Sequence, residues 1–136
     1  MKSRLPTDQE IAELLNFRSR LSGDGFKPVK SLHGGPSADG KTITIPWPDY
    51  QEVVEEFFEA ASRECWCDFE FVPVDAGRML ADHSFVNSAD LAHIKTMLTY
   101  CVQGERFGAG YWGKMIEEGH IERLLRRLAG ILDGNV

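Results

Sequence analysis

The chain has 136 residues, of which 43% are hydrophobic and 26% charged, and it carries a net charge of −6. This length suits one compact domain that folds without disulfides or metals, and the composition excludes a disordered chain. Residues 49–82 hold ten Asp or Glu against two Arg, a local net charge of −8. Nucleic-acid binding needs a concentrated basic face, so we expect no nucleic-acid partner.

Hydropathy and cysteine usage predict the compartment. The chain has no run of eighteen apolar residues, so neither a transmembrane helix nor a membrane partner is expected. Its first six residues are not followed by the apolar run of a signal peptide. Three cysteines, an odd number, indicate reduced thiols and predict a cytoplasmic location.

The N-terminal region predicts one helix followed by a long connection. Thr7 and Glu10 have the spacing of a capping box. The helix that it opens carries its apolar side chains three and four residues apart, at Ile11, Leu14, Leu15 and Leu21. Glycines at 23 and 25 end it, and residues 24–41 read as a mobile connecting loop.

Two short strands and one helix are expected next. Residues 42–45 are β-branched and are stopped by the prolines at 46 and 48, the second of which suits the first turn of a helix. That helix buries Val53, Val54, Phe57, Phe58 and Ala61. Residues 65–71 alternate between small or aromatic and polar side chains, which indicates a second strand.

The C-terminal third predicts three helices. Ser88 caps the first, and Gly104 ends it in the left-handed conformation. A short helix over 111–118 follows, and Gly119 separates it from a leucine-rich last helix. The fold class is therefore α+β: a helix-rich single domain over residues 1–136, with about four to five helices and a small two-strand element.

Residues 35–42 match the phosphate-loop pattern G-x-x-x-x-G-K-[ST], with Gly35, Gly40, Lys41 and Thr42 at the fixed positions. Such a loop needs a helix directly after it, whose N-terminus faces the phosphates. Here the next residues are strand-like and proline-blocked, and the proline at 36 removes a backbone donor. We therefore predict a hairpin-like turn that leads into an edge strand, with nucleotide binding as the less favoured alternative.

The sequence indicates no metal site and no cofactor. Cys65 and Cys67 are closer together than the usual pair of zinc ligands, and the four histidines fit no standard spacing. Alternating cysteines in a strand are more often buried small apolar residues.

Four polar residues form the candidate site: Glu105, Arg106, Glu117 and His120. Glu105 and Arg106 follow a helix end, and His120 begins the last helix, where the dipole favours a neutral imidazole that a nearby carboxylate can orient. The alternative is that these residues clamp a helix junction and have no further role.

The same block resembles a known family. Its members end with a pattern close to L-T-x-x-V-R-x-[ED]-R-F, followed by a glycine and a G-H-I step into a leucine-rich helix. This chain matches it at Leu98, Thr99, Val102, Glu105, Arg106, Phe107, Gly110, Gly119, His120 and Ile121. The resemblance covers about residues 45–132, strongly from 98, and departs at Gln103 and at 108–109. It is a bacterial family of unknown function, so it implies a fold and a cytosolic setting only.

We therefore expect a non-enzymatic binding or regulatory module with an unknown protein or small-molecule partner, and self-association as a homodimer stays open. Two alternatives remain. One is a small hydrolase or transferase that uses the residues at 105–120, and the other is a nucleotide binder that uses the loop 35–42.

Overall fold

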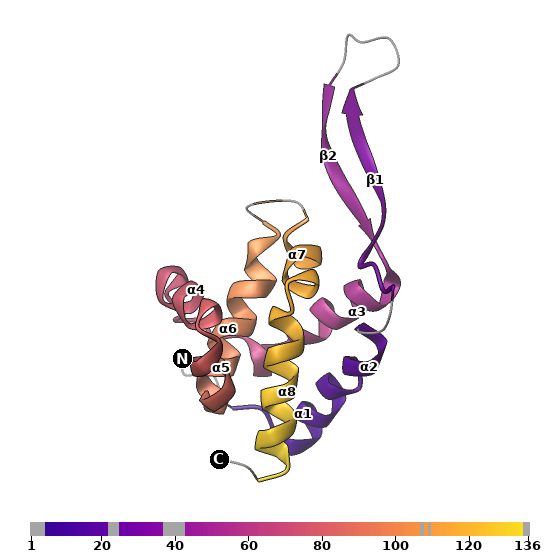
Figure 1. Cartoon of the computed structure of the whole chain (residues 1–136). Coiled ribbons are helices and arrows are strands. Elements are labelled where there is room, and N and C mark those ends of the chain that lie inside the picture. The colour runs from indigo at the N-terminus through magenta and orange to yellow at the C-terminus, as the bar shows by residue number, and fades with distance from the viewer. Residues whose placement is uncertain (1–4, 22–24, 37–42, 107, 109, 135–136) are drawn as a thin grey trace.

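The computed structural model describes residues 5–21, 25–36, 43–106, 108 and 110–134. It shows a helical body from which one β-hairpin projects (Figure 1). The elements are α1 (Asp8–Leu15), α2 (Arg18–Leu21), β1 (Val29–Pro36), β2 (Ile43–Tyr50), α3 (Glu52–Ala61), the 3₁₀ turn η1 (Glu64–Trp66), α4 (Pro73–Ala81), α5 (His83–Ser88), α6 (Leu91–Gly104), α7 (Tyr111–Glu117) and α8 (His120–Leu132). The helix-rich class with a two-stranded sheet is confirmed, but even without the single turn of α2 the described residues form more helices than expected.

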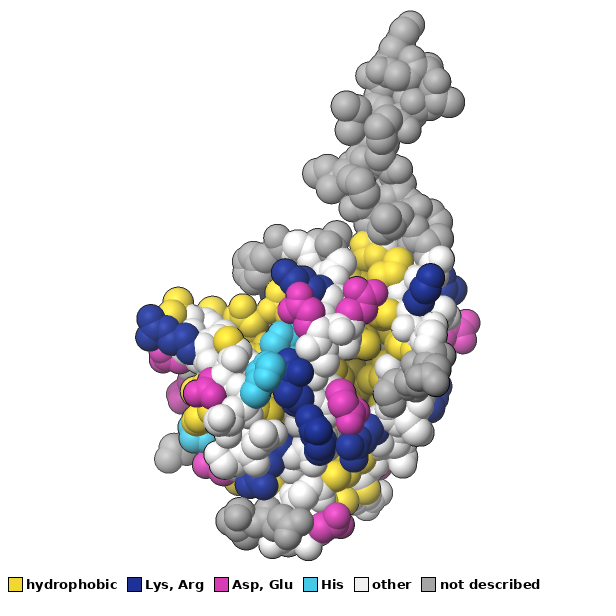
Figure 2. All heavy atoms as spheres, in the orientation of Figure 1, with side chains coloured by type: hydrophobic (Ala, Val, Ile, Leu, Met, Phe, Trp, Pro, Cys, Tyr) yellow, Lys and Arg dark blue, Asp and Glu magenta, His cyan; other side chains and the backbone are white. Residues whose placement is uncertain are grey.

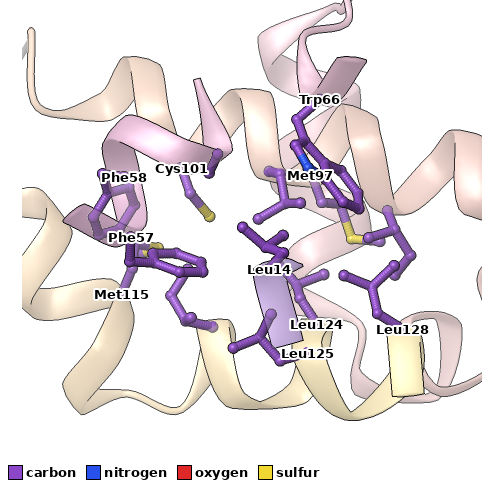
Figure 3. Packing of buried hydrophobic residues seen from close by; sticks show 14 of the residues in the cluster. Leu14, Phe57, Phe58, Trp66, Met97, Cys101, Met115, Leu124, Leu125 and Leu128 are labelled. Carbon is purple, nitrogen blue, oxygen red and sulfur yellow. The ribbon is translucent and has the colours of Figure 1, made fainter. Parts of the chain in front are cut away.

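One apolar core holds the helices together. Figure 3 shows side chains from most helices converging on it: Leu14, Phe57, Phe58, Trp66, Met97, Cys101, Met115, Leu124, Leu125 and Leu128. Burying each large apolar side chain of this kind stabilises the fold by about 1.5–3 kcal/mol. No described helix has both the length and the apolar character that crossing a membrane requires.

The first predicted helix is divided in two. Its capping box is confirmed, because Thr7 Oγ1 accepts from the Glu10 N–H and the Glu10 carboxylate accepts from the Thr7 N–H. The helix ends at Leu15, where the Phe17 N–H bonds to the Leu14 carbonyl, three residues back. The Phe17 ring then packs edge-on against Phe57, with 5.7 Å between the ring centroids.

The hairpin corrects three expectations. Residues 29–36 of the expected loop 24–41 form β1, which pairs antiparallel with β2. The second strand is therefore not residues 65–71. Prolines 46 and 48 do not stop β2, which runs on to Tyr50, and the helix begins only at Glu52. A two-stranded sheet leaves one edge of each strand without a partner, and proline, which lacks an N–H, is tolerated at such edges.

Residues 65–71 fold onto α6 instead of pairing as a strand. Cys65 and Trp66 are both buried, although alternation would place them on opposite faces. Side chains of α6 satisfy the polar groups here: the Asp68 N–H donates to Thr99 Oγ1 at 2.9 Å, and Thr96 Oγ1 donates to the Asp68 carboxylate at 2.6 Å. With no strand alongside, these contacts replace the ladder that a strand would need.

Helices α4 and α5 were not predicted from the sequence. Pro73 stands in the first turn of α4, a position that suits proline, and this was the available signal. The expected cap of α6 is also wrong. Asp90 caps α6 by accepting from the His93 N–H at 2.8 Å, whereas Ser88 ends α5 and bonds to its carbonyls.

Gly104 is needed for space and not for a left-handed turn. It is the last residue of α6, and positive φ angles among the described residues occur at other glycines, including Gly110 and Gly119. A Cβ at Gly104 would lie 2.1 Å from Cδ1 of Tyr111, far inside van der Waals contact. The Tyr111 ring therefore packs directly over the end of α6.

Replacing Gly104 with alanine should destabilise the protein. Alanine favours a helix over glycine by about 1 kcal/mol, but overpacking against Tyr111 should outweigh this and lower the free energy of unfolding by about 1–3 kcal/mol. Chemical denaturation of Gly104→Ala measures the change. Gly108→Ala is the control, because a Cβ there meets no atom within 4 Å. Equal effects of the two substitutions would contradict the packing explanation.

Candidate functional site

The Glu105 carboxylate caps the N-terminus of α7. The N-cap of α7 is Gly110, which has a φ of 95° and no side chain to offer. Glu105 follows α6 and supplies the missing acceptor: one oxygen accepts from the Gly110 N–H at 3.0 Å and the other from the Trp112 N–H at 2.9 Å. A carboxylate is favoured at a helix N-terminus, where unpaired N–H groups and the dipole meet it.

The same carboxylate binds the base of the hairpin. Tyr50, the last residue of β2, donates from its hydroxyl to Glu105 Oε1 at 2.8 Å. Its ring is buried and lies 5.7 Å from Trp112 between centroids. Burial, and then the hydrogen bond to Glu105, raise the pKa of Tyr50 above its ordinary value, so the phenol stays protonated and donates.

His120 lies at the other end of α7. Arginine can only donate, so its contact of 2.9 Å from Arg123 Nη2 makes His120 Nδ1 the acceptor and leaves the proton on Nε2. Nε2 lies 3.4 Å from a carboxylate oxygen of Glu118. The side chain is only 14% exposed. Burial, and then the Arg123 charge, lower the pKa of His120 below its ordinary 6.5.

Among the described residues, no hydrogen bond or ion pair joins one of the four candidate residues to another. Glu105 caps the start of α7 and His120 follows its end, and a seven-residue helix separates them by about 10 Å. Arg106 is exposed, and Glu117 is an exposed residue at the rim of an apolar hollow of about 210 Å³. The partners that the structure supplies are Tyr50 for Glu105 and Glu118 for His120. No sequence pattern indicated Tyr50 as a partner of Glu105, because the two residues lie 55 positions apart.

The phosphate-loop match begins in β1 and extends beyond the described residues. Gly35 is in β1, Gly40, Lys41 and Thr42 lie outside the described residues, and the chain continues from there into β2. A strand therefore stands where a phosphate loop requires a helix. Within the part of the chain that is described, no three His, Cys, Asp or Glu residues are grouped to hold a metal ion. Burial raises the pKa of the Cys101 thiol to about 12, which keeps that sulfur protonated.

The face that carries α8 is mixed in charge. Figure 2 shows basic and acidic side chains side by side there. Arg18 bonds to Glu122 at 2.8 Å, and Arg127 Nε donates to the Ala89 carbonyl at 2.8 Å. These arginines therefore hold α8 against its neighbours.

A hollow of about 410 Å³ lies between α1 and α3. We call it the α1–α3 groove. It is lined by Glu10, Glu13, Leu14, Phe17, Glu56, Glu59, Ala60, Arg63, Cys65 and Trp66. None of the four candidate residues lines this groove. The only sequence feature that indicated it was the excess of acidic residues over 49–82.

A comparison with family models gives one match that covers most of the chain. Residues 6–134 match the model of a family of unknown function, DUF6508. The chain belongs to this family. No match was found among curated proteins or among solved structures. The resemblance to an uncharacterised family is thus confirmed, and the match extends well beyond the C-terminal block. In this DUF6508 chain both the Glu105 junction and the α1–α3 groove lie inside the matched residues.

Removing the Glu105 carboxylate should loosen α7 and the hairpin together. Glu105→Ala leaves two N–H groups and the Tyr50 hydroxyl without their acceptor, so we expect the free energy of unfolding to fall by about 2–4 kcal/mol. The exposed Glu117→Ala should change it by less than about 0.5 kcal/mol. In a double-mutant cycle with Tyr50→Phe, the two sites should couple by about 1 kcal/mol or more. Strict additivity would show that the junction is not a unit.

His120 should make stability depend on pH. Its pKa is lowered in the folded state, so below about pH 6.5 the unfolded chain binds this proton more readily, and stability falls as pH falls. Urea unfolding at pH 7.5 and 5.5 should show a larger loss for the wild type than for His120→Gln. Parallel losses in the two proteins would exclude His120 as the cause.

Proposed function

We propose that this protein is a non-enzymatic binding module whose α1–α3 groove holds a basic, apolar-anchored helical segment of a partner protein. The observation that carries this proposal is the combination, in one hollow, of an apolar floor with a rim of four carboxylates.

The floor of the groove is apolar and firmly held. Leu14, Cys65 and Trp66 are each at most 3% exposed and belong to the core. Phe17 and Ala60 are partly buried and border the opening. An apolar side chain of a partner would contact this floor and lose its exposure to water, which supplies affinity.

The rim of the groove is acidic. Glu10 and Glu13 come from α1 and Glu56 and Glu59 from α3, against Arg63 alone among the lining residues. Arg63 reaches across the groove to Glu13 at 3.3 Å, with side chains 62% and 48% exposed. Exposed pairs like this one stabilise by only about 0–1 kcal/mol. Lysine or arginine side chains of a partner could therefore replace it at little cost.

The dimensions of the groove favour a helix as the guest. The groove is lined on one side by Glu10, Glu13 and Leu14 of α1 and on the other by Glu56, Glu59 and Ala60 of α3. Each set spans five residues, or about 6 Å of helix. Two helical walls of this length accommodate about one turn of an amphipathic helix, and binding such a helix in a groove is a recurring way to recognise a partner segment.

A synthetic amphipathic helix tests the proposal. The probe is a fluorescein-labelled peptide of about 18 leucine and lysine residues with one apolar face, long enough to form a helix. Fluorescence anisotropy should show saturable binding that weakens with salt. Glu56→Gln/Glu59→Gln should weaken it roughly tenfold, as expected when two ion pairs of about 0.7 kcal/mol are lost.

The matched control is Glu52→Gln/Glu55→Gln. These two carboxylates are exposed on the same helix outside the groove, so the charge change is identical and binding should change by less than about twofold. A peptide with glutamate in place of lysine should not bind. The proposal fails if neither peptide binds or if both pairs of substitutions weaken binding equally. It also fails if spermine binds as tightly as the peptide, because the groove would then hold a small cation.

A further inference from the structure

A second surface, independent of the groove, surrounds the start of α4. Three of the four exposed large hydrophobic residues in the described chain occur here, namely Phe69, Val72 and Val74, which are 61%, 52% and 62% exposed. Pro73 is also exposed, and with Phe71 it borders a small apolar cleft under Tyr100. We call residues 69–74 with the outer face of α4 the α4 patch. Apolar side chains gathered in this way are typical of an interaction site.

The outer face of α4 carries one charge of each sign. Ala76 and Leu80 are buried, so α4 points them inward. On a helix of 3.6 residues per turn, Arg78 then points about directly away from the core, and Asp75 lies about 60° to one side of it. Both residues are exposed, and within the described part of the chain neither forms an ion pair.

This arrangement is complementary to itself. If two copies of α4 pack antiparallel about a twofold axis between positions 76 and 77, Asp75 of each copy lies opposite Arg78 of the other. A twofold interface has this property, because each contact between two different positions occurs twice. The two charge pairs fix the register, and Val74 and Met79 flank them on opposite sides of the contact, about 70° from its centre.

We propose that the α4 patch is the interface of a homodimer in which α4 packs antiparallel against α4 of a second copy. The charges of Asp75 and Arg78 favour a second copy of the chain as the partner, because the partner must present an acid and a base three residues apart in the reverse order. A partner with only basic groups, as we propose for the α1–α3 groove, would meet repulsion at Arg78.

Sedimentation equilibrium of the full chain tests the dimer. Because the patch is small, we expect a reversible dimer that forms on the order of 10–100 µM. Asp75→Arg and Arg78→Asp should each weaken it at least roughly tenfold, because each creates two like-charge contacts across the axis. The double substitution Asp75→Arg/Arg78→Asp should restore the wild-type constant to within about threefold, since it re-forms both pairs in reverse.

Asp8→Arg is the matched control for the loss of an acid from the first turn of a helix. It should leave dimerisation unchanged, and circular dichroism should show every variant folded. A wild-type chain that stays monomeric at about 500 µM overturns the proposal, because that concentration is about fivefold above the range in which the dimer is expected to form. A dimer that survives both single substitutions, or one that the double substitution does not rescue, overturns it as well. Each result is independent of peptide binding in the groove.

Discussion

The structure depends on one carboxylate that joins three elements. Glu105 directly follows α6. Its carboxylate caps α7 and accepts a hydrogen bond from the hydroxyl of Tyr50 at the end of β2. A two-stranded ribbon is marginally stable in water on its own, and this hairpin projects from the helical body (Figure 1). Its base is held because Tyr50 is buried and bonded, and Trp112, beside Tyr50, stacks on Phe58 with 4.5 Å between ring centroids. The polar contact therefore fixes the position of the ribbon, and the aromatic contacts supply most of its attachment.

Features that depend on neighbouring residues could be predicted from the sequence, whereas contacts between residues distant in the sequence could not. The capping box at Thr7, the apolar stripe of α3 and the turn at Gly119 each depend on neighbours within four residues, and each was predicted correctly. The strand at 65–71 was wrong because alternation cannot show whether another strand lies alongside. Gly104 has a steric role that depends on where Tyr111 is placed, and no pattern within α6 could reveal it.

The candidate site shows the same division. We grouped Glu105, Arg106, Glu117 and His120 because they are close in sequence. In the structure, α7 lies between Glu105 and His120. Each end is completed by a residue that the pattern did not select: Tyr50, which is distant in sequence, and Glu118, which stands next to a residue that was selected. The surfaces on which the proposals rest depend on which helices pack side by side, and the sequence does not show this. Glu13 and Glu56, for example, line one groove because α1 and α3 are neighbours in the fold.

The first and last helices of the body pack against each other, and this has a consequence for biosynthesis. α1 lies along α8, and Arg18 bonds to Glu122 across 104 positions of sequence. Leu14 of α1 is 1% exposed in the folded protein, among the leucines of α8. On the ribosome, α1 emerges before α8 has been made, so its apolar stripe lacks this native cover until α8 follows. Contacts so distant in sequence slow folding and prolong the exposure of apolar surface. The core is thus completed only once α8 has been made.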